Sequence, residues 1–237
     1  MPTTSIEGPH SNAAAGTIDG VTFTAFGQPQ RIHENSTGAS AAFATAANRG
    51  SRYFNCFNAN QIPSDATITG MEIVAGTDFD GSGNSNFGNF GSTGASESAT
   101  FRVYLHNGTS YSSALTLDNS VAATGVTFNG DNTEVTLTGG NKRYLGITTL
   151  GVLAGANDSL SGLSFDPADQ ADFGFAVVCI AISATPVFGI LRGIGLRATY
   201  TEAATGYSHS VIGVASGNIG KVNALATANI GKINTLD

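Results

Sequence analysis

Short stretches of alternating apolar and polar residues recur along the first 200 residues of the chain. In ATFRVYLH, residues 99–106, the apolar residues Phe101, Val103 and Leu105 alternate with polar or amphipathic ones. This is the pattern of a strand with one face in a core. Comparable segments, rich in β-branched and aromatic residues and bounded by Gly, Asn, Asp or Ser, are residues 20–26, 51–57, 66–76, 133–138, 142–148 and 189–201. The pattern predicts an all-β protein.

One further stretch, FGFAVVCIAIS at residues 173–183, is apolar almost throughout. A run of this kind predicts a central strand that is covered on both faces. Glycines in residues 189–201 predict bends or bulges there, and residues 148–165 leave a strand and a short helix open. With about eight strands and scarcely a helical pattern, the chain is predicted to form a single jelly-roll type β-sandwich.

Three parts are expected along the chain. Residues 1–17 are small and polar and predict an N-terminal arm outside the core. Residues 18–201 form the predicted sandwich, and residues 202–237 form a C-terminal tail with two 11-residue repeats. The residues expected in the core are Phe101, Val103, Leu105, Val177, Val178, Ile180, Ile194 and Leu196.

Composition narrows the functional classes. The formal net charge is −7 and the ten basic residues are scattered, whereas a nucleic-acid surface needs clustered Lys and Arg. Cys56 and Cys179 both lie in apolar segments, where free core thiols and a disulfide between the two are both possible. The N-terminal residues do not resemble a signal peptide, and no apolar run approaches the ~18 residues of a membrane span. We expect a soluble protein, made in a cytoplasm, with neither nucleic acid nor a membrane as partner.

The loop at residues 78–98 contains a partial match to a calcium-binding loop. Asp78, Asp80, Ser82 and Gly83 fall at positions one, three, five and six of that pattern, but position twelve is Asn89 instead of Glu. The flanking segments are strand-like, whereas this motif lies between helices. A weak cation site and a Gly-rich surface loop both remain open.

No group of residues indicates a catalytic centre, a cofactor site or a metal site. The four histidines, of which His106 ends a strand and is expected to be half-exposed, have no metal-ligand spacing. A GxSxG nucleophile motif is absent. A glycosidase would need two facing carboxylates, and such grooves usually carry aromatic platforms, whereas the chain has no Trp. We expect a protein that is not an enzyme.

The tail contains two nearly identical peptides, GNIGKVNAL at 217–225 and ANIGKINTL at 228–236. Eleven residues are close to three helical turns, so its large apolar residues fall on one face of a helix. Three Gly and four Asn residues weaken helix formation, however. We interpret the tail as a docking peptide, the alternative being an unused extension or one packed on its own body. The predicted partner-docking residues are Ile219, Val222, Leu225, Ile230, Ile233, Leu236, Lys221 and Lys232.

Four segments carry a resemblance to a known class of proteins. They are IPSDATITGMEI at 62–73, FRVYL at 101–105, FGFAVV at 173–178 and GLRATYT at 195–201. In this order they resemble the jelly-roll structural proteins of tailed bacteriophages. The NIGKVNAL and NIGKINTL units likewise look like repeats at the ends of phage virion proteins. The resemblance covers residues 55–237.

Membership of that class would imply a virion structural protein without enzymatic activity. Such domains decorate the capsid as cement proteins, commonly as trimers, or belong to a tail fibre. The chain lacks the Trp and the long shaft of a fibre tip, so the resemblance favours a capsid cement or decoration protein that forms a homotrimer and contacts the major capsid protein, or another virion protein, through its tail. A tail or tail-fibre component, and a carbohydrate-binding module or hydrolase, are the alternatives.

Overall fold

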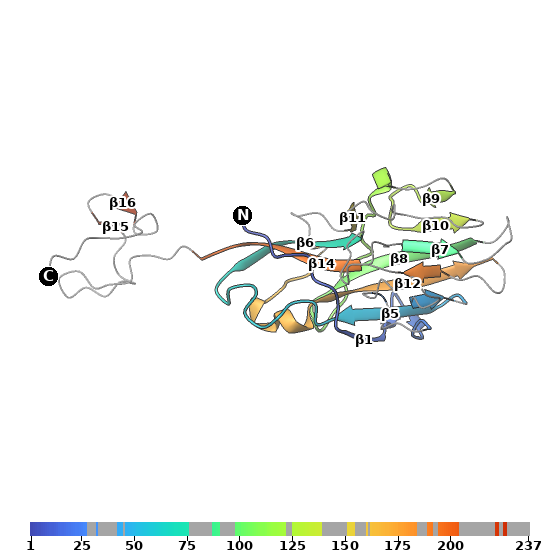
Figure 1. Cartoon of the computed structure of the whole chain (residues 1–237), viewed down its shortest axis with the longest axis horizontal. Coiled ribbons are helices and arrows are strands. Elements are labelled where there is room, and N and C mark those ends of the chain that lie inside the picture. The colour runs from blue at the N-terminus through green and yellow to red at the C-terminus, as the bar shows by residue number, and fades with distance from the viewer. Residues whose placement is uncertain are drawn as a thin grey trace. The chain divides into compact units, whose positions relative to one another are not determined.

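The structure is a computed structural model of the chain, shown in Figure 1. It describes residues 1–27, 32, 42–44, 46–75, 87–90, 98–121, 125–138, 151–154, 160, 162–183, 189–191, 194–203, 221–222 and 225–226. The chain divides into two compact units, Met1–Thr201 and Glu202–Asp237, called here the body and the tail.

The largest element of the body is a six-stranded antiparallel sheet. In spatial order its strands are β1 (Ser11–Ala14), β5 (Arg49–Phe54), β12 (Gly174–Ile182), β8 (Ser98–His106), β10 (Val135–Thr138) and β9 (Val126–Phe128). Figure 1 shows the long strands β5, β12 and β8 side by side. In the register of β12, Val177 lies opposite Ser51 on one side and Val103 on the other. The apolar strand therefore lies inside the sheet, away from its edges.

A second antiparallel sheet consists of β11 (Gly151–Ala154), β6 (Thr67–Ala75) and β14 (Ile194–Thr201), in that order. The remaining sheets of the body are smaller. One has the order β4 (Ala42–Ala44), β13 (Gly189–Leu191) and β7 (Phe87–Phe90), and the other is the hairpin of β2 (Gly16–Ile18) and β3 (Val21–Phe23). The expected strand at 189–201 is thus two strands, β13 and β14, in different sheets.

The main core lies between the six-stranded sheet and the sheet of β6 and β14. Both sheets direct alternate residues into it, and aromatic rings pack edge to face within it, as at Phe165 and Phe173. Residues contributed by the strands include Tyr53, Phe101, Val103, Leu105, Phe175, Val177, Met71, Ile73, Ile194 and Leu196. Helix is confined to short 3-10 turns in the described part of the chain, such as η2 (Asn119–Val121) and η3 (Pro167–Asp172). The all-β prediction is confirmed, while the jelly-roll strand order stays a prediction.

A second apolar cluster covers the opposite face of the six-stranded sheet. Tyr104, Ala176 and Val178 of the sheet pack with three residues of the N-terminal segment, namely Ala15, Ile18 and Phe23. The side chains of β12 are therefore buried on both faces along most of the strand, as the continuous apolar run predicted. Ile180, expected in the core, is only partly buried and packs at the margin of this second cluster.

The first 17 residues were expected to form an arm outside the core, and the structure places them differently. Residues 11–14 form β1, which pairs with β5 along its whole length. Thr4 and Glu7 form backbone hydrogen bonds with β14, and Ala15 is buried. Backbone pairing at the edge of a sheet does not require large apolar side chains. Small and polar residues can therefore form these contacts.

Some expected elements lie outside the described residues. The strand at 142–148 lies there, as does nearly all of the candidate calcium loop at 78–89, of which only the last residues belong to β7. In the ambiguous stretch 148–165, residues Gly151–Ala154 are a strand.

Candidate functional site

The predicted docking tail is described at four residues, and these form strands. Lys221–Val222 (β15) pairs in antiparallel fashion with Leu225–Ala226 (β16). Val222 lies directly opposite Leu225 in the pairing, and Lys221 lies opposite Ala226. The helical phase suggested by the spacing of the apolar residues is therefore not adopted here, which accords with the low helix propensity of the neighbouring Gly and Asn residues.

The hairpin brings together three of the eight predicted docking residues, namely Lys221, Val222 and Leu225. The other predicted docking residues, Ile219, Ile230, Ile233, Leu236 and Lys232, lie outside the described residues.

On the body, the most unusual polar group is His106, at the end of β8. It was expected to be half-exposed, but only 2% of it is exposed. The edge of its ring contacts the ring of Tyr111, with centroids 4.6 Å apart, because the chain turns back after β8 and pairs Tyr111 with His106. Burial, with the positive charge of Arg52 as a second cause, lowers the pKa of His106 to about 4. The imidazole is therefore neutral at pH 7.

Arg52, on β5, reaches His106 across the face of the sheet. Its Nη1 lies 3.1 Å from His106 Nε2, and its guanidinium carbon lies 4.8 Å from the centre of the Phe54 ring, a cation–π distance. Its Nε is buried and has no hydrogen-bond partner. Ala176, which pairs with Arg52 on the strand between Arg52 and His106, has a small side chain that leaves room for this crossing.

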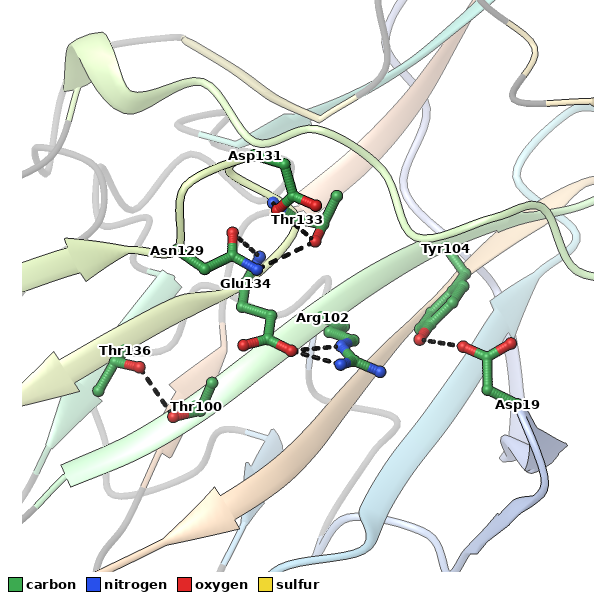
Figure 2. Close-up of polar contacts among 9 residues, drawn as sticks. All are labelled: Asp19, Thr100, Arg102, Tyr104, Asn129, Asp131, Thr133, Glu134 and Thr136. Atoms are coloured by element: carbon green, nitrogen blue, oxygen red, sulfur yellow. Dashed lines mark hydrogen bonds and ion pairs between the residues drawn. The ribbon is translucent and has the colours of Figure 1, made fainter.

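A row of cross-strand polar pairs occupies the same face of the sheet (Figure 2). Thr100 and Thr136 share a hydrogen bond of 2.8 Å between their hydroxyl groups. Arg102 donates from Nε and Nη2 to one carboxylate oxygen of Glu134, the Nε contact being 2.9 Å. The Tyr104 hydroxyl donates to Asp19 Oδ2 at 3.1 Å. β8 is thus tied to β10 on one side and to the turn of the β2–β3 hairpin on the other.

The turn before β10 holds this row in place. Asn129 accepts a hydrogen bond from the backbone of Glu134 and donates to Thr133, and the Asp131 carboxylate accepts from Thr133 (Figure 2). Backbone and side-chain hydrogen bonds from Thr133 lower the pKa of Asp131. Burial opposes the charge of Arg102, but its interactions with Glu134 and Tyr104 together outweigh this and raise the pKa of Arg102. The carboxylates of Asp131 and Glu134 thus form hydrogen bonds that hold the turn and link it to β8.

Neither cysteine has the environment of a reactive thiol. Cys56 and Cys179 are both free and buried, which confirms the free-thiol alternative over a disulfide. Burial raises the pKa of Cys179 to about 12 and also raises that of Cys56. A thiolate is the nucleophilic and metal-binding form, so both residues act as core packing.

The described residues lack two further features that would indicate other classes of function. Within them, no three or more His, Cys, Asp or Glu side chains cluster closely enough to hold a metal ion. In the same part of the chain, none of the helices has the length and apolar character required to cross a membrane. The polar row of Figure 2 therefore offers hydrogen bonds and an ion pair, but no set of metal ligands.

The chain matches no protein-family model, no curated protein and no solved structure.

Proposed function

We propose that the chain is a non-enzymatic structural protein of a tailed-bacteriophage virion, a capsid cement or decoration protein with a jelly-roll body, made in the cytoplasm of the bacterial host. The observation that carries the proposal is the division of the chain. The body, Met1–Thr201, contains the six-stranded sheet and both apolar clusters, and the repeated peptide lies in a separate unit, Glu202–Asp237. A repeated peptide in a unit of its own is well suited to attachment.

The energetics of the tail favour attachment through more than apolar contact. Burial of its six large apolar side chains would contribute about 9–18 kcal/mol, at about 1.5–3 kcal/mol each. Ordering about 20 backbone residues would cost roughly 20–40 kcal/mol. Backbone hydrogen bonds to the partner must therefore supply part of the difference, and the extended residues of β15 and β16 are in a conformation that can form them.

Several copies acting together would strengthen attachment further. Linked binding segments gain affinity through effective concentration, without any new contact. We therefore propose a homotrimer on the particle, with the tails contacting the major capsid protein or another virion protein. A low density of charge, 11% of the residues, keeps the desolvation cost of such symmetric contacts small.

The experiment that tests attachment is co-sedimentation with particles that lack the protein. A chain ending at Glu202 is expected to fold, because the body is a compact unit by itself, and to remain in the supernatant. Replacement of Ile219, Ile230 and Ile233 by Ser should reproduce the loss. Exchange of Lys221 and Lys232 for Gln should weaken binding modestly, and chiefly at low salt, because exposed charge interactions are screened.

The full-length chain and a scrambled tail of identical composition are the matched controls. The scrambled tail preserves charge and hydrophobicity but destroys the repeat, and we expect it not to bind. If the chain ending at Glu202 binds as well as the full chain, the tail is not the anchor and the proposal loses its mechanism.

A further inference from the structure

The hydrogen-bond partners of His106 are both donors. The backbone N–H of Gly108 donates to Nδ1 at 2.9 Å, and the Arg52 Nη1 lies 3.1 Å from Nε2. A neutral imidazole has only one nitrogen that accepts, and the other carries a hydrogen. Either tautomer therefore satisfies one of the two contacts. A protonated ring carries a hydrogen on both nitrogens and satisfies neither.

Charge adds to this mismatch. Arg52 is cationic at every relevant pH, so a protonated His106 would place a second positive charge about one hydrogen-bond length away. Like charges at such a distance disfavour each other strongly in a buried setting. The junction of β5, β8 and the turn after β8 is thus built around a neutral ring.

This junction is connected to the N-terminal hairpin that covers the sheet. Tyr111, whose ring packs on His106, donates its hydroxyl to the backbone carbonyl of Ala15 at 2.6 Å. Ala15 immediately precedes β2 and belongs to the second apolar cluster. The turn between the histidine and the tyrosine is short, since Asn107 and Ser110 are joined by a backbone hydrogen bond. Displacement of the His106 ring would therefore also displace Tyr111 and its contact with the N-terminal hairpin.

We propose that His106 is an acid-sensitive latch: its protonation displaces the turn of residues 107–111 and, through Tyr111, releases the β2–β3 hairpin from the outer face of the six-stranded sheet. Release exposes the side chains of Tyr104, Ala176 and Val178, which the hairpin buries at neutral pH. These side chains would then be available for contact only in acid.

The other titratable groups near the junction define what else changes in acid. Arg52 on β5 keeps its charge, and Tyr104 and Tyr111 stay neutral, since burial raises the pKa of both. Asp19, on the hairpin, accepts from Tyr104, and Asp172, at the end of η3, lies beside Gly108. The test must therefore separate the contribution of these two carboxylates from that of the histidine.

The sign of the pH effect follows from the direction of the shift. The ordinary pKa of His is 6.5, and that of His106 in the folded chain is lowered to about 4. The open state therefore binds the proton more readily than the closed state. The latch is fully stable above about pH 6.5, weakens as the pH falls through this window, and is weakest below about pH 4.

The test is hydrogen–deuterium exchange of the full chain from pH 7 to pH 3, corrected for intrinsic rates. We expect peptides covering residues 16–23 and 107–111 to lose protection as the pH falls from about 6.5 to about 4, while β12 stays protected. His106→Gln keeps an acceptor for Arg52 but does not titrate, so it should hold the hairpin closed to lower pH. His10→Gln, which removes an exposed histidine, should leave the transition unchanged.

A second variant keeps the proposal falsifiable if His106→Gln does not fold. Arg52→Gln removes the neighbouring charge, so the closed state should bind the proton more readily and opening should move to lower pH, although burial still disfavours the charged ring. The proposal is overturned if Arg52→Gln leaves the transition where it is, or if His106→Gln opens at the same pH as the natural chain. It is equally overturned if the hairpin and β12 lose protection together.

Discussion

Val177 and Val178 are neighbours on β12 whose side chains enter opposite apolar clusters. Val177 lies in the main core, and Val178 lies under the N-terminal hairpin. Both are fully buried, at 0% exposure. If one face of the strand were exposed to solvent, truncation would lower the free energy of unfolding strongly at one of the two positions and only slightly at the other. Because β12 is covered on both faces, we expect similar costs from Val177→Ala and Val178→Ala.

The magnitude follows from the atoms removed. Each substitution deletes two methyl groups, worth about 1.6 kcal/mol of transfer free energy at about 0.8 kcal/mol each. The cavity left behind adds to this where the surroundings cannot collapse. We expect each single substitution to lower the free energy of unfolding by about 2–3 kcal/mol, measured by urea denaturation with fluorescence and circular dichroism as independent probes.

A double-mutant cycle distinguishes the two faces. Phe23 belongs to the hairpin cover and shares a cluster with Val178, whereas Val177 lies on the other side of the sheet. Phe23→Ala should therefore couple with Val178→Ala by about 0.5–3 kcal/mol, and should be additive with Val177→Ala within about 0.5 kcal/mol. A cost below about 0.5 kcal/mol for Val178→Ala, or equal coupling to both valines, would refute the two-sided burial of β12.

Two further predictions concern local geometry. In Gly174→Ala, the new β-carbon would lie 1.8 Å from the Tyr53 carbonyl oxygen, so thermal denaturation should show that the free energy of unfolding falls by about 3 kcal/mol. In the control Gly130→Ala, the new β-carbon would have nothing within 4 Å, and the free energy of unfolding should change by no more than about 0.5 kcal/mol. Equal stabilities of the two variants would contradict the close approach at Gly174. Cys56 and Cys179 should not react with a thiol-specific reagent in the native chain at pH 7, because burial raises their pKa values, and both should react in urea; rapid native labelling would show that the core is open.

The long strands were predictable because each one buries a face. The alternation of Phe101, Val103 and Leu105 predicted β8, and the unbroken apolar run predicted a central β12, since both patterns reflect the solvent environment of successive side chains. The short edge strands were not predictable. β1 has the sequence SNAA, and its strand conformation comes from pairing with β5, which is remote in sequence.

The site was less predictable than the fold, because burial of a strand's second face depends on what covers it. His106 was expected to be a half-exposed strand end, but the return of the chain at Tyr111 and the reach of Arg52 help to bury it. In the tail, the spacing of apolar residues suggested a helical face, while local pairing produced the hairpin of Val222 and Leu225. The spacing of apolar residues along the sequence indicates which side chains are buried. It does not predict the conformation of a segment whose structure is set by backbone pairing with another segment.

The proposal that the chain is a capsid cement protein is tested most directly by its copy number in purified virus particles. Quantitative mass spectrometry of the intact particle, with isotope-labelled peptides from this chain and from the major capsid protein as standards, gives the ratio. We expect the copy number of this chain to approach that of the major capsid protein. A few copies per particle would contradict a cement role and favour a tail or fibre component, and absence from the particle would contradict a virion role altogether.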